Sequence, residues 1–77
     1  MRKIKGIEIK KGVAFGKPVI AGTRISVEFI LDLLASGWKI NKILKHYPHL
    51  RKSDIQAALT YSRDLIKEWK GYPLTNR

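Results

Sequence analysis

Cysteine is absent from the 77 residues of the chain. This absence excludes a disulfide framework, a thiol nucleophile and a cysteine-based zinc site, and it is compatible with a reducing compartment. Long apolar runs are absent as well. Gly6, Glu8, Lys10 and Lys11 interrupt the basic N-terminus before an apolar run of signal-peptide length can form, and no stretch is long enough to span a membrane. We therefore expect a cytoplasmic protein without a membrane-spanning segment.

Acidic residues are few. Six Asp and Glu stand against sixteen Lys and Arg, so the formal net charge is +10 at pH 7. Such an excess creates a positive potential over part of the surface of a small protein. It favours a polyanion or an acidic protein as the partner, and lysines that serve only solubility are the alternative. The positive excess lies mainly at the two ends of the chain.

Residue sets suited to catalysis or metal binding are missing. His46 and His49 are three residues apart, but Pro48 between them breaks a continuous helix, and no neighbouring acid or cysteine completes a metal site. Glu28 and Asp32 share one face of a predicted helix without a nucleophile or a third ligand. We therefore expect no enzymatic activity, no metal and no cofactor.

The length suits one domain near the lower limit for folding alone, so oligomerisation is expected. We divide it into an N-terminal β segment (1–25), a three-helix unit (26–70) and a C-terminal tail (71–77). The predicted fold class is therefore mainly α, with a short β segment or hairpin before the helices.

Within the β segment, separated apolar residues and several glycines indicate short strands. Residues 10–12 are expected to close a hairpin between 7–9 and 13–15. Pro18 has no N–H group and is expected on a sheet edge or at the start of a strand.

The first helix is expected to begin after Ser26 as N-cap and to stop at Gly37. A second, short helix is expected after Asn41 as N-cap and should end before Pro48. The apolar face of the first helix, which is expected in the core, consists of Phe29, Ile30, Leu33 and Leu34.

The third helix is expected to start at Ser53, where Gln56 three residues later completes a capping box, and to reach about Trp69. Apolar and small residues recur at helical spacing and predict an inward stripe. The predicted stripe consists of Ile55, Ala58, Leu59, Ser62, Leu65, Ile66 and Trp69.

Two helices joined by a short corner, with a third to brace them, are typical of a helix-turn-helix that binds double-stranded DNA. In that interpretation Gln56 contacts an adenine, Thr60 contacts a thymine methyl group or a phosphate, and basic residues bind phosphates. The predicted phosphate contacts are Arg51, Lys52, Arg63 and Lys67. The alternative is a solvated face of a three-helix bundle, and Asp54 would repel phosphate if it pointed at the duplex.

The segment from Gly16 to Ile25 concentrates residues that demand a particular backbone shape. One interpretation is an anion-binding turn, in which Gly22 and Thr23 N–H groups and the Arg24 guanidinium bind a phosphate or carboxylate. The other is a structural turn, in which Arg24 binds backbone carbonyls and locks the hairpin onto the first helix. The predicted partner-binding or structural turn residues are Gly16, Pro18, Gly22, Thr23 and Arg24.

Two motifs resemble the domain of unknown function 433 family. They are Gly16-Lys17-Pro18-Val19-Ile20 followed by Gly22-Thr23-Arg24-Ile25, and Tyr47-Pro48-His49-Leu50. The resemblance, which extends from about residue 4 to residue 66, implies a homeodomain-like three-helix unit after a short β segment. It also implies the antitoxin of a type II toxin–antitoxin pair, with a PIN-like ribonuclease toxin and operator DNA as partners.

The chain departs from the family pattern at several positions. Phe15 stands where glycine is common, and His46 stands where an acid usually precedes the tyrosine. Lys39, Lys42 and Lys45 belong to a helix that is commonly acidic in the family. A basic helix weakens a model in which it opposes a toxin's RNA groove, and it strengthens nucleic-acid binding.

Two functional hypotheses follow. The first is a DNA-binding antitoxin that represses its own transcript. The second is a protein-interaction module that neutralises a toxin through the first helix and the β segment without specific DNA binding. A homodimer is expected, since one short helix reads few bases, and the N-terminal strands or the first helix are expected to form its contact.

Overall fold

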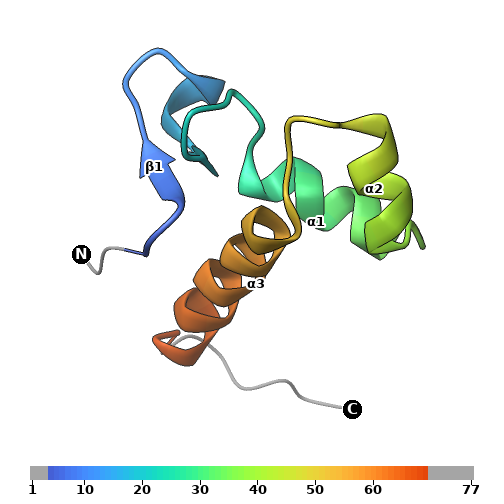
Figure 1. The fold of residues 1–77 in the computed structure, drawn as a ribbon. Coiled ribbons are helices and arrows are strands. Elements are labelled where there is room, and N and C mark those ends of the chain that lie inside the picture. The colour runs from blue at the N-terminus through green and yellow to red at the C-terminus, as the bar shows by residue number, and fades with distance from the viewer. Residues whose placement is uncertain (1–3, 70–77) are drawn as a thin grey trace.

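The computed structural model describes residues 4–69. A two-stranded antiparallel sheet precedes three helices, which confirms the predicted fold class (Figure 1). The strands and the turn between them are β1 (Ile7–Ile9), the 3-10 turn η1 (Ala14–Gly16) and β2 (Pro18–Ile20). The helices are α1 (Val27–Ala35), α2 (Ile40–His46) and α3 (Lys52–Lys67). None of the helices within residues 4–69 has the length and apolar character needed to cross a membrane.

The hairpin pairs β1 with β2, so that Ile7 lies opposite Ile20 and Ile9 opposite Pro18. The predicted pairing of 7–9 with 13–15 is wrong. Ala14 and Phe15 have φ angles of 50° and 57°, and this left-handed conformation is incompatible with a strand. Residues 14–16 therefore form η1 in a longer connection, and Pro18 begins the second strand, one of the two places expected for it.

The start of α1 agrees with the sequence. Ser26 Oγ accepts a hydrogen bond of 2.9 Å from the backbone N–H of Phe29, and Gly37 follows the helix with a φ of 93°. The start of α2 does not agree, since its N-cap is Lys39 and Asn41 already lies within the helix. No side chain caps this helix, so the preference of asparagine for N-caps had no structural counterpart here.

The predicted capping box of α3 is also displaced. The helix begins at Lys52, which places Ser53 inside its first turn, and the Asp54 carboxylate accepts a hydrogen bond of 2.9 Å from the Arg51 backbone N–H. An acid at this position satisfies an N–H group at the helix start and interacts favourably with the helix dipole. The helix ends at Lys67, slightly before Trp69, and the predicted tail (71–77) lies outside the described residues.

One apolar cluster joins all the elements. Its buried members come from β2, α1, α2, the α2–α3 connection and the first half of α3: Ile20, Val27, Ile30, Ile43, Leu50, Ile55 and Ala58. Of the predicted face of α1, Ile30 is buried and Leu33 and Leu34 pack partly buried against the cluster, whereas Phe29 is more exposed and packs its ring edge-on against Tyr47.

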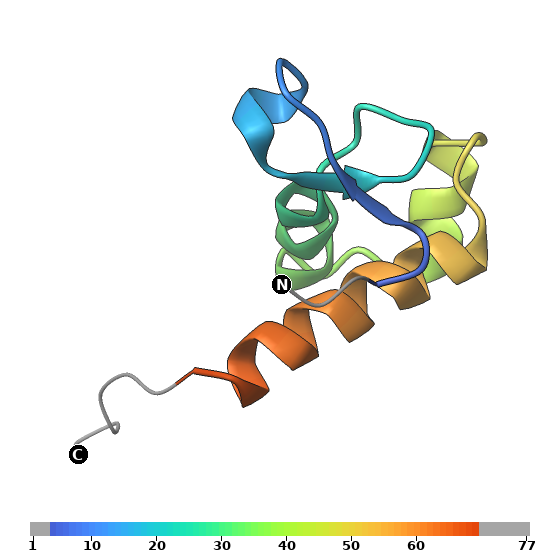
Figure 2. The same cartoon turned by 90° about the vertical axis from the view of Figure 1, so that its left-hand side faces the viewer.

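The C-terminal half of α3 extends past the body of the protein (Figure 2). The predicted inward stripe is therefore only partly correct. Ile55 and Ala58 are buried and Ser62 is half-buried, but the large apolar residues of the stripe beyond Ile55 are exposed. Its exposed residues are Leu59 (37%), Leu65 (54%), Ile66 (73%) and Trp69 (68%).

Candidate nucleic-acid interface

Five of the six predicted DNA-binding residues share one face of α3. At 100° per residue, they fall within about 80° of the helix circumference, on the side turned away from the core. Four are exposed, and Thr60 is half-buried. We call this face the α3 strip, and its residues are Lys52, Gln56, Thr60, Arg63 and Lys67.

The sixth predicted residue, Arg51, lies just before α3. Its guanidinium is 3.7 Å from an Asp54 carboxylate oxygen and remains largely exposed. On the strip, Arg63 pairs with Asp64 at 3.0 Å, and here too the guanidinium is largely exposed while the carboxylate is mostly covered. Both guanidinium groups therefore face solvent, where a phosphate can reach them.

Asp54 itself lies away from the strip. It is only 7% exposed, on the core side of α3, and its carboxylate is directed at the backbone N–H of Arg51. Asp54 therefore does not face a groove occupied by α3, and its repulsion of phosphate is small. Its structural role also explains why an acid stands in an otherwise basic part of the chain.

The segment before β1 runs beside the first half of α3 (Figure 2). Gly6, with a φ of 90°, is packed so closely that a Cβ atom there would lie 3.2 Å from the Cβ of Ala57. Lys5 lines a shallow pocket together with Gln56 and Thr60. Lys5 therefore adds a positive charge beside the α3 strip. Gln56 and Thr60 are 51 and 55 residues away from Lys5 in the chain, so no local pattern could have shown this proximity.

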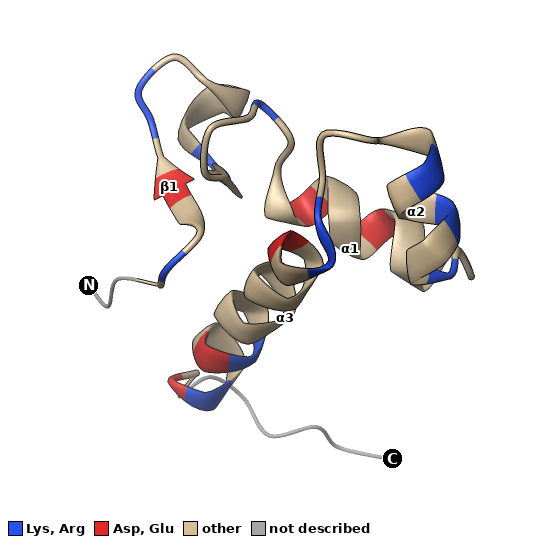
Figure 3. Cartoon of the chain, viewed as in Figure 1, with Lys and Arg blue, Asp and Glu red and all other residues tan. Residues whose placement is uncertain are grey.

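Residues 38–53 contain five Lys or Arg and no Asp or Glu. Figure 3 shows these basic positions on α2 and on the connection to α3. The Lys42 ammonium lies 4.1 Å from the centroid of the Trp38 ring, and this cation–π contact holds the charge at the surface of α2. Lys45 is exposed on the same helix, and Lys39 is exposed at its N-cap.

The turn at Gly22 and Thr23 is held by internal hydrogen bonds. Thr23 Oγ1 donates to the Ile20 carbonyl at 2.8 Å and accepts from the Ile25 N–H at 3.0 Å. The Thr23 N–H also donates to the Ile20 carbonyl, and the Gly22 N–H donates to a Glu8 carboxylate oxygen at 3.4 Å. The N–H groups that an external anion would need are thus already engaged.

These bonds favour the structural interpretation of the turn, with one correction. Arg24 is exposed and forms no hydrogen bond or ion pair with any residue between 4 and 69, so Thr23 rather than Arg24 locks the turn. Of the other predicted turn residues, Gly16 closes η1 with a φ of 77° and Pro18 begins β2.

Glu8 ties β1 to this turn. The hydrogen bond from the Lys10 ammonium, at 3.1 Å, together with the weaker one from the Gly22 N–H, holds the pKa of the Glu8 carboxyl below its usual range. The carboxylate is therefore ionised at neutral pH and occupies the position in which an anionic ligand would meet the turn.

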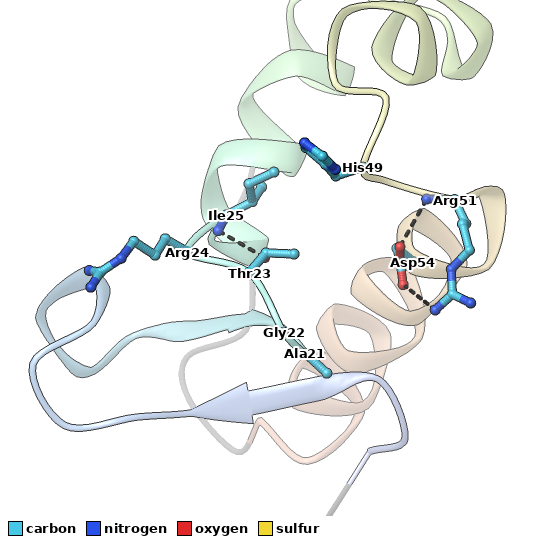
Figure 4. A pocket seen from close by; sticks show the side chains of 8 residues that line it. All are labelled: Ala21, Gly22, Thr23, Arg24, Ile25, His49, Arg51 and Asp54. Atoms are coloured by element: carbon cyan, nitrogen blue, oxygen red, sulfur yellow. Dashed lines mark hydrogen bonds and ion pairs between the residues drawn. The ribbon is translucent and has the colours of Figure 1, made fainter.

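The two family-like motifs meet at one open pocket of about 610 Å³ (Figure 4). One wall is the turn from Ala21 to Ile25, and the other consists of His49, Arg51 and Asp54. In Figure 4 the Arg24 side chain points away from His49, and Arg51 folds toward Asp54. The cations do not converge on one point, so the pocket is not arranged to hold a single small anion.

His46 and His49 take different places. The His46 ring contacts the Trp38 ring edge-on, with 5.0 Å between the centroids, and its Nδ1 lies 3.1 Å from the Lys42 carbonyl oxygen. His49 lies on the α2–α3 connection beside the open pocket. Within residues 4–69, no group of three or more His, Asp or Glu side chains gathers in a metal-binding arrangement.

Comparison with known proteins agrees with this geometry. A crystal structure of a DUF433 member protein from Anabaena variabilis ATCC 29413 is similar, with a TM-score of 0.76 and 30% sequence identity over 82% of this chain. The chain spans 62% of the length of that protein. No curated protein matches it. The family model described as "Protein of unknown function (DUF433)" matches residues 7–62, and the chain belongs to this family.

Proposed function

We propose that the protein is a DNA-binding regulator that inserts the first half of α3 into the major groove. The observation that carries the proposal is the α3 strip, an exposed face on which three basic and two polar side chains are aligned. A major groove admits one α-helix, and base edges are read by side chains near the start of that helix. The strip places Gln56 at that position, with Thr60 one turn further along.

The surrounding charges fit contacts to both sides of the groove. Lys52 and Arg51 lie at the start of α3, and Arg63 and Lys67 lie about three and four turns after Lys52 on the same side of the helix. The basic surface of α2 is next to this start, where the first helix of a helix-turn-helix crosses the phosphate backbone. Each phosphate contact adds affinity without sequence preference, whereas Gln56 supplies discrimination of about 1–3 kcal/mol by pairing with adenine.

Within this proposal the protein serves as the antitoxin of a toxin–antitoxin pair and represses the shared transcript. This role rests on the family resemblance, which implies a PIN-like ribonuclease toxin as the protein partner. The basic surface of α2 supports the DNA-binding half of the role. It does not suit docking against the RNA groove of a ribonuclease, because that groove is itself positively charged.

The test is fluorescence anisotropy with a labelled duplex from the chain's own upstream region and with a scrambled duplex, in a salt series. We expect tighter binding to the native duplex that persists as salt rises. The joint variant Lys52→Gln, Arg63→Gln and Lys67→Gln should lower affinity and reduce the slope of log K against log salt by about 2.7, because each lost phosphate contact removes about 0.9.

A matched control removes the same charge elsewhere. Lys10→Gln, Lys11→Gln and Arg24→Gln change three basic residues on the hairpin side of the protein, away from the α3 strip. This control should retain most of the affinity and salt slope. Equal losses in the two triple variants, or equal affinity for both duplexes, would show that the charge acts as a non-specific field and would refute the proposed face.

The second candidate is a protein-interaction module, and the open pocket beside the Ala21–Ile25 turn favours it. The turn and the α2–α3 connection are distant in sequence, yet both motifs of the family contribute to its walls. Co-purification of a neighbouring PIN-like protein that survives high salt and is lost in Arg24→Glu, without any sequence preference on DNA, would support this candidate over the first.

A further inference from the structure

The C-terminal end of α3 exposes several large apolar side chains to water. Leu59, Leu65 and Ile66 lie on α3 and Trp69 follows just after its end, and all four are exposed. We call these four residues the apolar stripe. It is centred roughly 120° around the helix from the α3 strip, so the two surfaces do not compete.

An apolar groove runs beside the apolar stripe. It has a volume of about 330 Å³ and lies between α3 and the start of α1. Its walls include Pro18, Val27, Leu31 and Tyr61, together with Leu65 and Ile66 of α3. The Lys17–Glu28 ion pair, with 2.6 Å between ammonium and carboxylate, lies at the edge of this groove. An apolar centre with a charged rim is the usual anatomy of a protein interface.

The exposed area is large for so small a protein. A large apolar residue offers about 150–250 Å² of surface, so the exposed fractions leave roughly 450 Å² of apolar area on the four residues. This lies within the range of about 300–600 Å² for the largest apolar patch on a typical monomer, and such patches are often functional. Two copies facing each other would bury roughly 900 Å² of this apolar surface. The groove walls would add further buried area, and a specific interface buries roughly 1,200–2,000 Å².

The charge distribution favours a second copy of this chain as the partner on the apolar stripe. Residues 59–69 contain two basic and two acidic side chains and are neutral, so the whole net charge of +10 lies in the rest of the chain. Two copies of the protein repel each other over most of their surfaces, but not at this segment. A second copy therefore meets the least electrostatic resistance at the same place where it buries the most apolar area.

We propose that a second copy of this chain docks on the apolar stripe, so that the C-terminal halves of two α3 helices pack around a two-fold axis. In this arrangement Ile66 and Trp69 of each copy enter the groove beside the other copy's α3, and the contact is isologous. This interface differs from the one expected at the N-terminal strands or the first helix. The strands are three residues long, and they expose less apolar surface than α3 does.

The first test is the mass of the whole chain in solution, by light scattering after size exclusion across the micromolar range and without DNA. We expect twice the monomer mass of 8.8 kDa. Ile66→Glu should give a monomer with unchanged helix content, because this side chain is exposed in the monomer and glutamate is a good helix former. Phe15→Glu is the matched control, since Phe15 is an exposed apolar residue that belongs neither to the stripe nor to the walls of the groove, and it should remain a dimer.

A second test uses the absence of native cysteine. Ile66→Cys should form a covalent dimer under mild oxidation, because equivalent residues near a two-fold axis approach each other, whereas Phe15→Cys should not. A monomeric wild type, a dimeric Ile66→Glu variant or equal cross-linking of the two cysteine variants would overturn the proposal. These measurements contain no DNA, so their outcome is independent of the proposed function.

Discussion

Two adjacent residues at the start of α3, Ser53 and Asp54, are both chemically able to cap the helix. The local pattern predicts that Ser53 caps the helix, whereas the structure assigns the cap to Asp54, which accepts the 2.9 Å hydrogen bond from the Arg51 N–H. Asp54→Ala removes this bond, worth about 1 kcal/mol, and a carboxylate near the helix N-terminus, worth about 0.3–1 kcal/mol. The better helix propensity of alanine returns about 0.5 kcal/mol. The ion pair with the exposed Arg51 guanidinium adds little at 3.7 Å.

The expected net loss is therefore about 1 kcal/mol in the free energy of unfolding. For a domain of this size, this corresponds to a fall in Tm of roughly 4–8 °C. Ser53→Ala is the matched comparison one residue away. Ser53 is exposed and its hydroxyl forms no hydrogen bond with any residue between 4 and 69, so this change should leave Tm unchanged or raise it slightly.

Thermal unfolding followed by circular dichroism at neutral pH and constant protein concentration measures both variants. Constant concentration matters because self-association would contribute to Tm. A fall in Tm for Ser53→Ala that equals or exceeds the fall for Asp54→Ala would refute the assignment, because it would show that the serine hydroxyl caps the helix in solution.

Two further predictions concern the hairpin. Glu8→Gln should lower Tm at neutral pH but not in acid: the folded pKa of Glu8 lies below its unfolded value of about 4.3, so its contribution is present above that pH and is lost as pH falls through the folded pKa. Melting curves of wild type and variant that stay equally far apart at about pH 7 and about pH 3 would contradict this reasoning. Phe15→Gly should raise stability by roughly 1 kcal/mol, because Phe15 is 99% exposed and is held at a φ of 57°, which costs about 1–3 kcal/mol for a residue other than glycine. Glycine returns part of this gain as backbone entropy, and an unchanged or lower denaturant midpoint would contradict the prediction.

Fold class could be predicted because apolar spacing and strong local signals agree along most of the chain. Ser26 illustrates this, since a serine that precedes a periodic apolar run did cap the helix. The caps of α2 and α3 could not be predicted, because several adjacent residues were chemically able to serve. The choice between Asn41 and Lys39, or between Ser53 and Asp54, depends on where the packed core places the first turn.

The strand that pairs with β1 could not be predicted from the apolar pattern of a short sequence segment. Residues 13–15 have apolar character suitable for a strand, but the left-handed backbone at Ala14 and Phe15 turns the chain and delays the second strand to Pro18. The departure from the family at Phe15 was visible in sequence. The φ of 57° at Phe15 is a conformation that glycine adopts without strain.

For the candidate site, helical periodicity was sufficient to place five predicted residues on one face of α3. It could not show that Lys5 lies beside them, since this contact depends on the path of the segment before β1 across Ala57. The same periodicity assigned Leu65, Ile66 and Trp69 to the core. Periodicity shows which side of a helix is apolar, but not whether a neighbouring element is long enough to cover it.

The two halves of α3 differ in how far their apolar side is covered, and this allows one helix to bind DNA at one end and a second copy at the other under the two proposals. The first half of α3 has its apolar side buried by α1, α2 and the hairpin, which fixes the orientation of the α3 strip relative to the basic surface of α2. The second half keeps the same apolar side, but Leu65 and Ile66 there stay largely exposed beside the open groove next to α1. A rigid helix of 16 residues spans about 24 Å, so contact between two copies at one end would set the distance between the strips at the other. Under the two proposals, Ile66→Glu should therefore weaken binding to a duplex with two half-sites much more than binding to a single half-site, whereas Lys52→Gln should weaken both, because it removes one phosphate contact from every bound copy.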